Sequence, residues 1–212
     1  MVDQRSPLDT GDVTVVTAMG VEARAVRRLL PQLRLVRAGI GLAALDPRML
    51  TTPVVLSVGL AGGLAAELAP GTVVVPTQVA REDGMLVPCD LAWSEALEAG
   101  SRRLGYPTTT AALLSADGMV TRDGRLMWSQ RGFAAVDMET ALLAALVSRV
   151  AAVRVVLDTP SHEISAAWDH PARAVLDPRN WSDAAWLMRA GPRYSRRAAL
   201  VVAAALANLA VT

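Results

Sequence analysis

The sequence predicts an α/β protein in which short apolar strands alternate with helices around a largely parallel sheet. The first observation is this alternation along the chain of 212 residues, a length that suits one large domain. The second is the composition, since 52% of the residues are hydrophobic and 19% are charged. Such a chain can bury enough apolar surface to offset the entropy lost on ordering, which excludes an intrinsically disordered protein.

The first part of the chain predicts two strands, one helix and a glycine-rich loop. Residues 13–17 form a β-branched apolar run, and residues 21–30 form an amphipathic helix that Pro31 closes. Residues 54–58 form the next strand. It leads into residues 59–63, which we expect to be a loop because three of these five residues are glycine.

The rest of the chain continues the alternation. Further strands are expected at residues 72–75 (with Val79 beyond Pro76), 111–115, 133–136 and 153–157. Helices are expected at residues 93–104, 121–130, 138–150 and 198–211. Between residues 161 and 192 three prolines loosen the pattern before the closing alanine-rich helix.

Charge and composition exclude several classes of function. The 21 basic residues nearly cancel the 20 acidic ones, so the overall charge indicates neither a nucleic acid nor an anionic membrane as a partner. All the basic residues are arginine, which excludes a Schiff-base lysine and a P-loop lysine. Arg193, Arg196 and Arg197 form a local basic cluster, but the balanced charge of the rest of the chain disfavours a nucleic-acid binder.

Cysteine and histidine are too scarce for a disulfide or a structural metal site. The single Cys89 has no partner, and His162 and His170 are the two histidines, so we predict no metal and a reducing cytoplasmic location. Residues 1–12 lack an apolar core and predict a polar leader before a domain at residues 13–212. Residues 198–211 fall short of the ~20 apolar residues that span a bilayer, which indicates a buried or interface helix and no membrane span.

Acidic residues follow three of the predicted strands. Glu22 comes shortly after the first strand, Asp137 and Glu139 follow residues 133–136, and Asp158 follows residues 153–157. Because ligands of open α/β sheets bind outside the carboxyl ends of the strands, these carboxylates are candidates for one shared crevice. Ordinary structural roles remain open, since Asp137 suits a helix N-cap and Asp158 suits a turn.

Four segments together resemble the nucleoside phosphorylase and nucleosidase superfamily, which includes methylthioadenosine/S-adenosylhomocysteine nucleosidases. They occur in the family's order at residues 17–22 (TAMGVE), 59–64 with 70–75 (GLAGGL, PGTVVV), 135–140 (AVDMET) and 154–158 (RVVLD). The resemblance implies a single-domain phosphorylase/hydrolase-like fold with a mixed central sheet flanked by helices. The sequences at residues 22–24 (EAR) and 136–139 (VDME) look most like those of the branch called hopanoid-associated phosphorylases. This resemblance implies a substrate of the adenosyl-lipid type.

The resemblance also implies roles for matching residues in cleaving the N-glycosidic bond of a purine nucleoside, with 5′-modified adenosine as the expected substrate. Asp158 would be the general acid at N7 of the leaving purine, Glu22 would polarise the attacking water, and Arg154 would orient that water or hold an anionic nucleophile. Glu139 would bind the ribose hydroxyls. The other expected contacts are Met138 under the sugar, Met119 and Val120 at the base, and Leu60 and Gly62 in the glycine-rich segment.

This sequence departs from the family at two polar positions. Leu60 and Leu157 stand where nucleosidases usually have serine. The change makes the expected pocket more apolar, which suits a substrate with an apolar 5′ group. It also suits an alternative, a catalytically impaired protein that binds nucleosides without turning them over.

The resemblance leaves the acceptor open between water and inorganic phosphate, and it implies no other cofactor. A phosphate site would draw on Arg24, Arg154 and the backbone amides of residues 39–41, although Glu22 would repel the anion. Relatives assemble as dimers or larger oligomers, so we expect a homo-oligomer in which residues 198–211 contribute to the interface.

Overall fold

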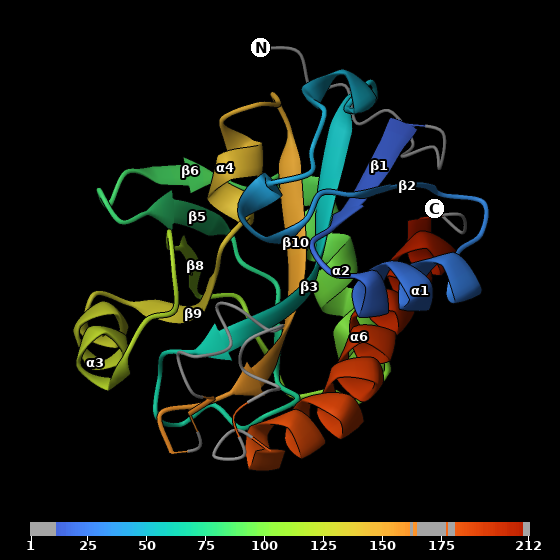
Figure 1. Cartoon of the computed structure of the whole chain (residues 1–212). Coiled ribbons are helices and arrows are strands. Elements are labelled where there is room, and N and C mark those ends of the chain that lie inside the picture. The colour runs from blue at the N-terminus through green and yellow to red at the C-terminus, as the bar shows by residue number, and fades with distance from the viewer. Residues whose placement is uncertain (1–11, 162, 165–176, 178–180, 210–212) are drawn as a thin grey trace.

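The computed structural model of the chain describes residues 12–161, 163–164, 177 and 181–209. A central sheet of ten strands has helices packed around it, with α1, α2 and α6 on one side and α3 and α4 on the other (Figure 1). The predicted α/β fold with a mixed central sheet in a single domain is confirmed.

The elements have the following bounds. The strands are β1 (Val13–Thr17), β2 (Arg34–Arg37), β3 (Val54–Gly63), β4 (Val73–Val74), β5 (Gln78–Arg81), β6 (Leu86–Pro88), β7 (Thr108–Thr109), β8 (Ala112–Ser115), β9 (Phe133–Asp137) and β10 (Val150–Asp158). The helices are α1 (Gly20–Leu29), α2 (Leu91–Arg103), α3 (Arg122–Gln130), α4 (Thr140–Ala144) and α6 (Trp181–Leu209), with 3₁₀ turns η2 (Ile40–Leu42) and η3 (Pro47–Met49).

The centre of the sheet explains how distant segments meet. Strand β3 pairs in parallel with β1 on one side and β10 on the other, so these three strands end at the same edge. Strand β9 instead crosses the end of β3 in antiparallel sense, with Val136 opposite Gly62. The carboxyl ends of β3, β9 and β10 therefore converge, although the sheet is not parallel throughout.

The glycine-rich segment at residues 59–63 is not a loop, contrary to the sequence prediction. Strand β3 continues to Gly63 and stays paired with β10 up to Gly62 opposite Asp158. A side chain at Gly59 would collide with its neighbours, because an added Cβ would lie 2.4 Å from Oε1 of Glu22 and 2.5 Å from Nη1 of Arg154. Glycine at this position leaves room for the side chains of Glu22 and Arg154 beside an ordinary strand.

Two predicted helices have the wrong length. The helix expected at residues 138–150 is limited to α4, because the chain turns after Ala144 and already pairs with β3 from Arg149 onwards. The last helix begins at Trp181, well before residue 198, and it contains Pro192. Proline usually ends a helix, but Pro192 lies on the exposed side, while Ala190, Tyr194 and Ala198 are buried and hold the helix against the core.

The apolar end of α6 is covered by the chain itself. Ala198, Val201 and Ala205 are buried in the main core cluster, and α6 approaches α2 so closely that a Cβ on Gly100 would lie 2.9 Å from the backbone nitrogen of Ala205. This part of α6 therefore packs within the chain. Among the described helices, none combines the length and apolar character needed to cross a bilayer.

Candidate active site

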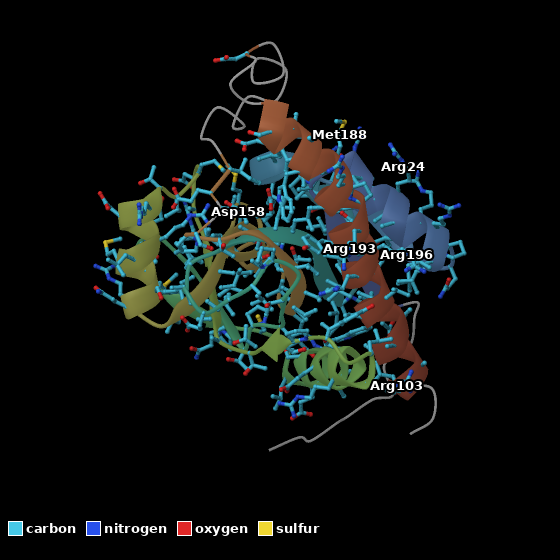
Figure 2. All side chains as sticks on the ribbon, turned by 90° about the horizontal axis from the view of Figure 1, so that it is seen from below. Arg24, Arg103, Asp158, Met188, Arg193 and Arg196 are labelled. Carbon is cyan, nitrogen blue, oxygen red and sulfur yellow. The ribbon has the colours of Figure 1, made fainter. Side chains whose placement is uncertain are left out.

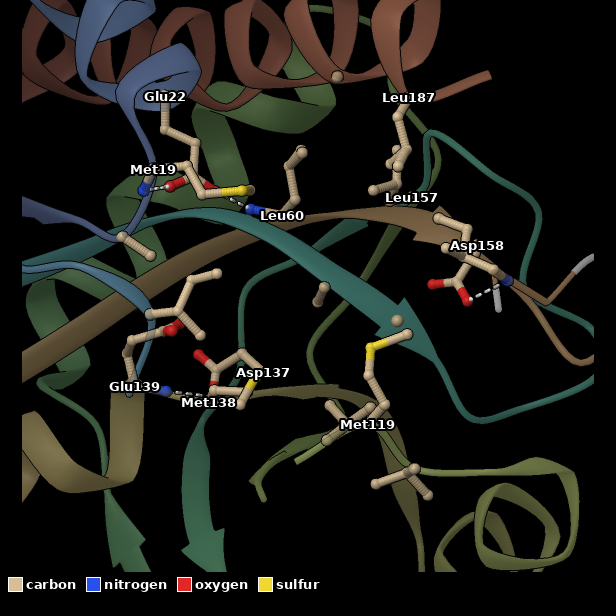
Figure 3. A pocket seen from close by; sticks show the side chains of 18 of the residues that line it. Met19, Glu22, Leu60, Met119, Asp137, Met138, Glu139, Leu157, Asp158 and Leu187 are labelled. Carbon is tan, nitrogen blue, oxygen red and sulfur yellow. Dashed lines mark hydrogen bonds between the residues drawn. The ribbon is translucent and has the colours of Figure 1, made fainter. Parts of the chain in front are cut away.

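A cavity of about 340 Å³ lies at the convergence of β1, β3, β9 and β10. Its walls also include Leu187 and Gly191 of α6 and the segment between β8 and α3 (Figure 3). The structure brings Glu22, Glu139 and Asp158 together on the walls of this one cavity. Segments that are remote in sequence thus deliver three carboxylates to the same space.

The other residues expected to bind substrate also reach this cavity. Met138, Met119, Val120, Leu60 and Gly62 all line it. Figure 3 shows Met119 and Met138 extending into the space between the carboxylates. Most of the remaining wall is apolar, so a ligand here would lose most of its contact with water.

Glu22 is fixed by backbone amides from two elements. In the first turn of α1, its Oε2 accepts a 2.8 Å hydrogen bond from the N–H of Met19, and its Oε1 accepts a 2.9 Å bond from the N–H of Leu60. Burial raises the pKa of the Glu22 carboxyl, while the nearby Arg154 and the amide donors act in the opposite direction. The two amide donors therefore hold the Glu22 carboxyl group in a fixed orientation, and they replace part of the hydration that it loses on burial.

Arg154 lies beneath the cavity and is not among the residues that line it. Its Nη2 lies 2.7 Å from Oδ2 of Asp137 and 3.5 Å from Oε2 of Glu139, and it also donates to the hydroxyl of Ser57 at 2.7 Å. Burial lowers the pKa of Arg154, but the surrounding carboxylates outweigh this effect and raise it. Arg154 is thus a permanent cation that neutralises part of the carboxylate cluster, and it does not face the ligand space as expected.

Glu139 connects the cavity to the 3₁₀ turn η2. Its Oε1 accepts a 3.0 Å hydrogen bond from the N–H of Gly41. Burial raises the pKa of Glu139 to about 7, and the carboxylate of Asp137 adds to this rise while Arg154 opposes it. Glu139 can therefore change its charge near neutral pH.

Asp137 was considered for the shared crevice but was not assigned a role, and the structure gives it a central position. Its carboxylate accepts hydrogen bonds from the N–H and hydroxyl of Thr140 and from Ser115 Oγ at 2.5 Å, in addition to its ion pair with Arg154. It thus receives backbone donors at the start of α4, as the structural interpretation suggested, and it also holds Arg154 in place.

Arg125 is a site residue that the sequence interpretation missed. Its Nη2 lies 2.5 Å from Oδ2 of Asp158, and its Nη1 and Nε donate to the carbonyls of Gly63 and Val120. The side chain is only 3% exposed. The sequence of α3 is largely polar, and nothing in it distinguishes Arg125 from its exposed neighbour Arg122. The burial of Arg125 is therefore a result of tertiary structure.

The arrangement suits the cleavage of a bond that leaves positive charge on one fragment. Glu22 and Glu139 flank the central part of the cavity, and Asp158 lies at another end beside Met119 (Figure 3). Carboxylates around a developing cation lower its energy, and a carboxyl at the leaving group can supply a proton. Among the described residues, no cluster of histidine, cysteine, aspartate and glutamate has the form of a metal site.

Sequence comparison identifies the family to which this site belongs. The sequence model of the phosphorylase superfamily matches residues 35–206, which is most of the chain. The chain belongs to the phosphorylase superfamily. The comparison with curated proteins gave no match.

Solved structures of nucleosidases and of a hydrolase have a similar fold. A 5′-methylthioadenosine/S-adenosylhomocysteine nucleosidase from Neisseria meningitidis, in complex with methylthio-immucillin-A, is 20% identical with a TM-score of 0.71, over 92% of this chain and 98% of that one. Futalosine hydrolase of Helicobacter pylori is 13% identical with a TM-score of 0.72, over 92% and 97%. A Helicobacter pylori nucleosidase mutant with 5′-methylthioadenosine in its active site is 12% identical with a TM-score of 0.71, over 93% and 98%.

Proposed function

We propose that this chain cleaves the N-glycosidic bond of a purine nucleoside by hydrolysis, with 5′-modified adenosine as its substrate class. The observation that carries the proposal is the presence of Glu22, Glu139 and Asp158 on the walls of one largely apolar cavity. Membership of the phosphorylase superfamily and the fold shared with nucleosidases support the same reaction type.

The proposed reaction assigns one step to each carboxylate. Asp158 passes a proton from solvent to N7 as the C1′–N9 bond breaks and the electron pair of that bond moves to the base. Glu139 accepts hydrogen bonds from the ribose hydroxyls and stabilises the cationic sugar. Water attacks C1′ and gives a proton to Glu22. Exchange with solvent then removes the proton from Glu22 and balances the one that Asp158 passed to the base, so the net change is addition of water.

The acceptor that the surroundings favour is water. Of the groups expected to hold phosphate, Arg24 lies exposed on α1, Arg154 is paired with Asp137 and Glu139, and the N–H of Gly41 donates to Glu139. A phosphate dianion beside Glu22 would be repelled by that carboxylate, and the remaining cation among these groups, Arg24, does not line the cavity. We therefore propose that the acceptor is water, and we assign inorganic phosphate no role as co-substrate or ligand.

The 5′ substituent that the cavity favours is apolar. Leu60 and Leu157 line it at the two positions where serine was expected, and Met19 and Leu187 add further apolar surface. The similar solved structures include one with bound 5′-methylthioadenosine, a compact member of this substrate class. The assembled carboxylates argue against the alternative of a protein that binds nucleosides without turnover.

The test is incubation with 5′-methylthioadenosine and with adenosines bearing longer 5′-alkylthio groups, with and without phosphate. We expect release of free adenine and the free thio-sugar, at a rate that does not depend on phosphate, as measured by chromatography. Asp158→Asn, which keeps the size of the side chain, should lower the rate 10²- to 10⁴-fold. A phosphorylated sugar product would contradict hydrolysis, and an unimpaired D158N variant would contradict the role of Asp158.

Several further properties are proposals of the same kind. We infer a homo-oligomer and a place in the hopanoid-associated branch from the family resemblance, and a cytoplasmic location from the single cysteine. Burial of Ala198, Val201 and Ala205 within the chain removes the reason for assigning the interface to the end of α6. Light scattering of the purified chain tests the oligomer, and turnover of adenosines with lipid-like 5′ groups tests the branch. The leader at residues 1–12 lies outside the described residues except for Asp12.

A further inference from the structure

Helices α1 and α6 pack side by side and present a surface rich in arginine (Figure 2). We call this surface the basic face. It consists of six exposed side chains: Arg24, Arg27, Arg28, Arg189, Arg193 and Arg196. The near balance of charge over the whole sequence conceals this local excess.

Helical spacing directs the arginines of each helix to one side. With 3.6 residues per turn, Arg189, Arg193 and Arg196 fall within an arc of about 60°. Arg24, Arg27 and Arg28 fall within an arc of about 100° on α1. The arginines of α6 therefore form a row along the outer side of the helix rather than a scattered set.

Acidic residues do not neutralise the basic face. Among the described residues of α1 and α6, the acids are Glu22, which is buried in the cavity, and Asp183, in the first turn of α6. None of the six arginines forms an ion pair with another described residue. Exposed acids such as Glu82 and Asp117 belong to other elements, so positive charge is concentrated on this side.

The basic face and the cavity lie on opposite sides of α6, since Arg189, Arg193 and Arg196 fall about 180° around the helix from Leu187 and Gly191. Leu187 and Gly191 of α6 line the cavity, while Met188 between them is 73% exposed at the edge of the arginine row (Figure 2). Ile40, another residue of the cavity wall, is 40% exposed. A surface that combines a row of cations with an exposed apolar side chain matches the interface of an anionic bilayer, where headgroups bind arginine and the acyl boundary accepts methionine.

We propose that the basic face docks the chain on the surface of an anionic phospholipid bilayer. This docking is peripheral and does not depend on the proposed reaction. Each arginine near an anionic surface strengthens binding about fivefold. Loss of the three arginines on α6 should therefore weaken binding about 100-fold.

Two other partners fit the basic face less well. A second copy of the chain placed symmetrically on this face would bring like charges together. A nucleic acid would gain little from base stacking on this face. Of the described aromatic residues that follow the start of α6, Trp186 is half-buried and Tyr194 is buried. The experiment below includes the nucleic acid as one of its outcomes.

The experiment is sedimentation of the full chain with vesicles of phosphatidylcholine alone or mixed with phosphatidylglycerol. We expect binding to the mixed vesicles that weakens as salt is added, and little binding to phosphatidylcholine. The variant R189Q/R193Q/R196Q should lose about 100-fold in affinity. The matched control R48Q/R102Q/R122Q removes the same charge from exposed positions on other elements and should retain most of the affinity.

Two further measurements decide the outcome. Met188→Ser should weaken vesicle binding even at high salt, because it removes an apolar contact rather than a charge, and it leaves the arginines in place. Thermal unfolding of each variant shows that the fold is retained. Absence of binding to anionic vesicles, equal losses in the two triple variants, or tighter binding to a duplex DNA probe than to vesicles would overturn the proposal.

Discussion

The guanidinium of Arg125 lies 2.5 Å from Oδ2 of Asp158, and both side chains are buried at the end of the cavity. Arg125 is itself fixed by the carbonyls of Gly63 and Val120. The ion pair occupies one oxygen of Asp158, and the other oxygen lies near Gly62 on the cavity wall. Arg125 thus determines which oxygen of the proposed acid can face a purine.

Removal of Arg125 should impair release of a base that needs a proton. We expect Arg125→Gln to lower kcat for 5′-methylthioadenosine about 10- to 100-fold, because Asp158 loses its orientation. A p-nitrophenyl riboside, whose leaving group needs no proton, should be cleaved at nearly the normal rate. An equal loss with both substrates would mean that the substitution damages the site as a whole.

The pKa of about 7 for Glu139 predicts a pH dependence of binding. Only the carboxylate can accept hydrogen bonds at both oxygens from the ribose hydroxyls, so KM should fall as the pH rises from about 6 to 8. Glu139→Gln should flatten this dependence. Substrates that lack the 2′ and 3′ hydroxyls should show no such dependence even with unaltered protein.

The same group predicts how stability changes with pH. Because the folded pKa of about 7 lies above the usual 4.5 of a glutamate, Glu139 binds its proton more tightly in the folded state, and its cost to stability grows as pH rises between these values. The free energy of unfolding of E139Q, measured relative to the unaltered protein, should therefore increase from pH 5 to pH 8 by about 1–3 kcal/mol. A difference that is constant with pH would contradict the raised pKa.

Gly59 should tolerate no side chain. Gly59→Ala would place a methyl group within 2.5 Å of Glu22 and Arg154, and we expect destabilisation by about 1–3 kcal/mol from overpacking together with loss of nearly all activity. Gly20→Ala is the control, since its added methyl group would come no nearer than 3.6 Å to the Arg37 side chain. Denaturant unfolding and adenine release distinguish the two variants.

Cys89 should be inert in the folded protein. Burial raises the pKa of its thiol to about 12, and the carboxylates of Asp137 and Asp90 add to the rise. Since the thiolate is the reactive form, a thiol reagent at pH 8 should modify Cys89 at the rate at which the fold opens, and rapidly in denaturant. Fast labelling without denaturant would show that this part of the core is accessible.

Local patterns predicted most of the strands and the carboxylates that follow them, because burial of β-branched runs is visible in sequence. The glycine-rich segment was misread, since glycine predicts flexibility, whereas at Gly59 it provides space for side chains from α1 and β10. Pro192 hid the first half of α6 for a similar reason, because packing of Tyr194 and Ala198 outweighs its local effect. Arg125 could not be found, since its burial depends on contacts with remote residues.

Arg154 extends from the middle of β10, where its backbone lies opposite Gly59 of β3. The guanidinium that balances the carboxylates is therefore built into the two innermost strands rather than carried on a surface segment. Catalytic competence and integrity of the sheet should consequently disappear at the same denaturant concentration, with no partly unfolded form that still turns over substrate.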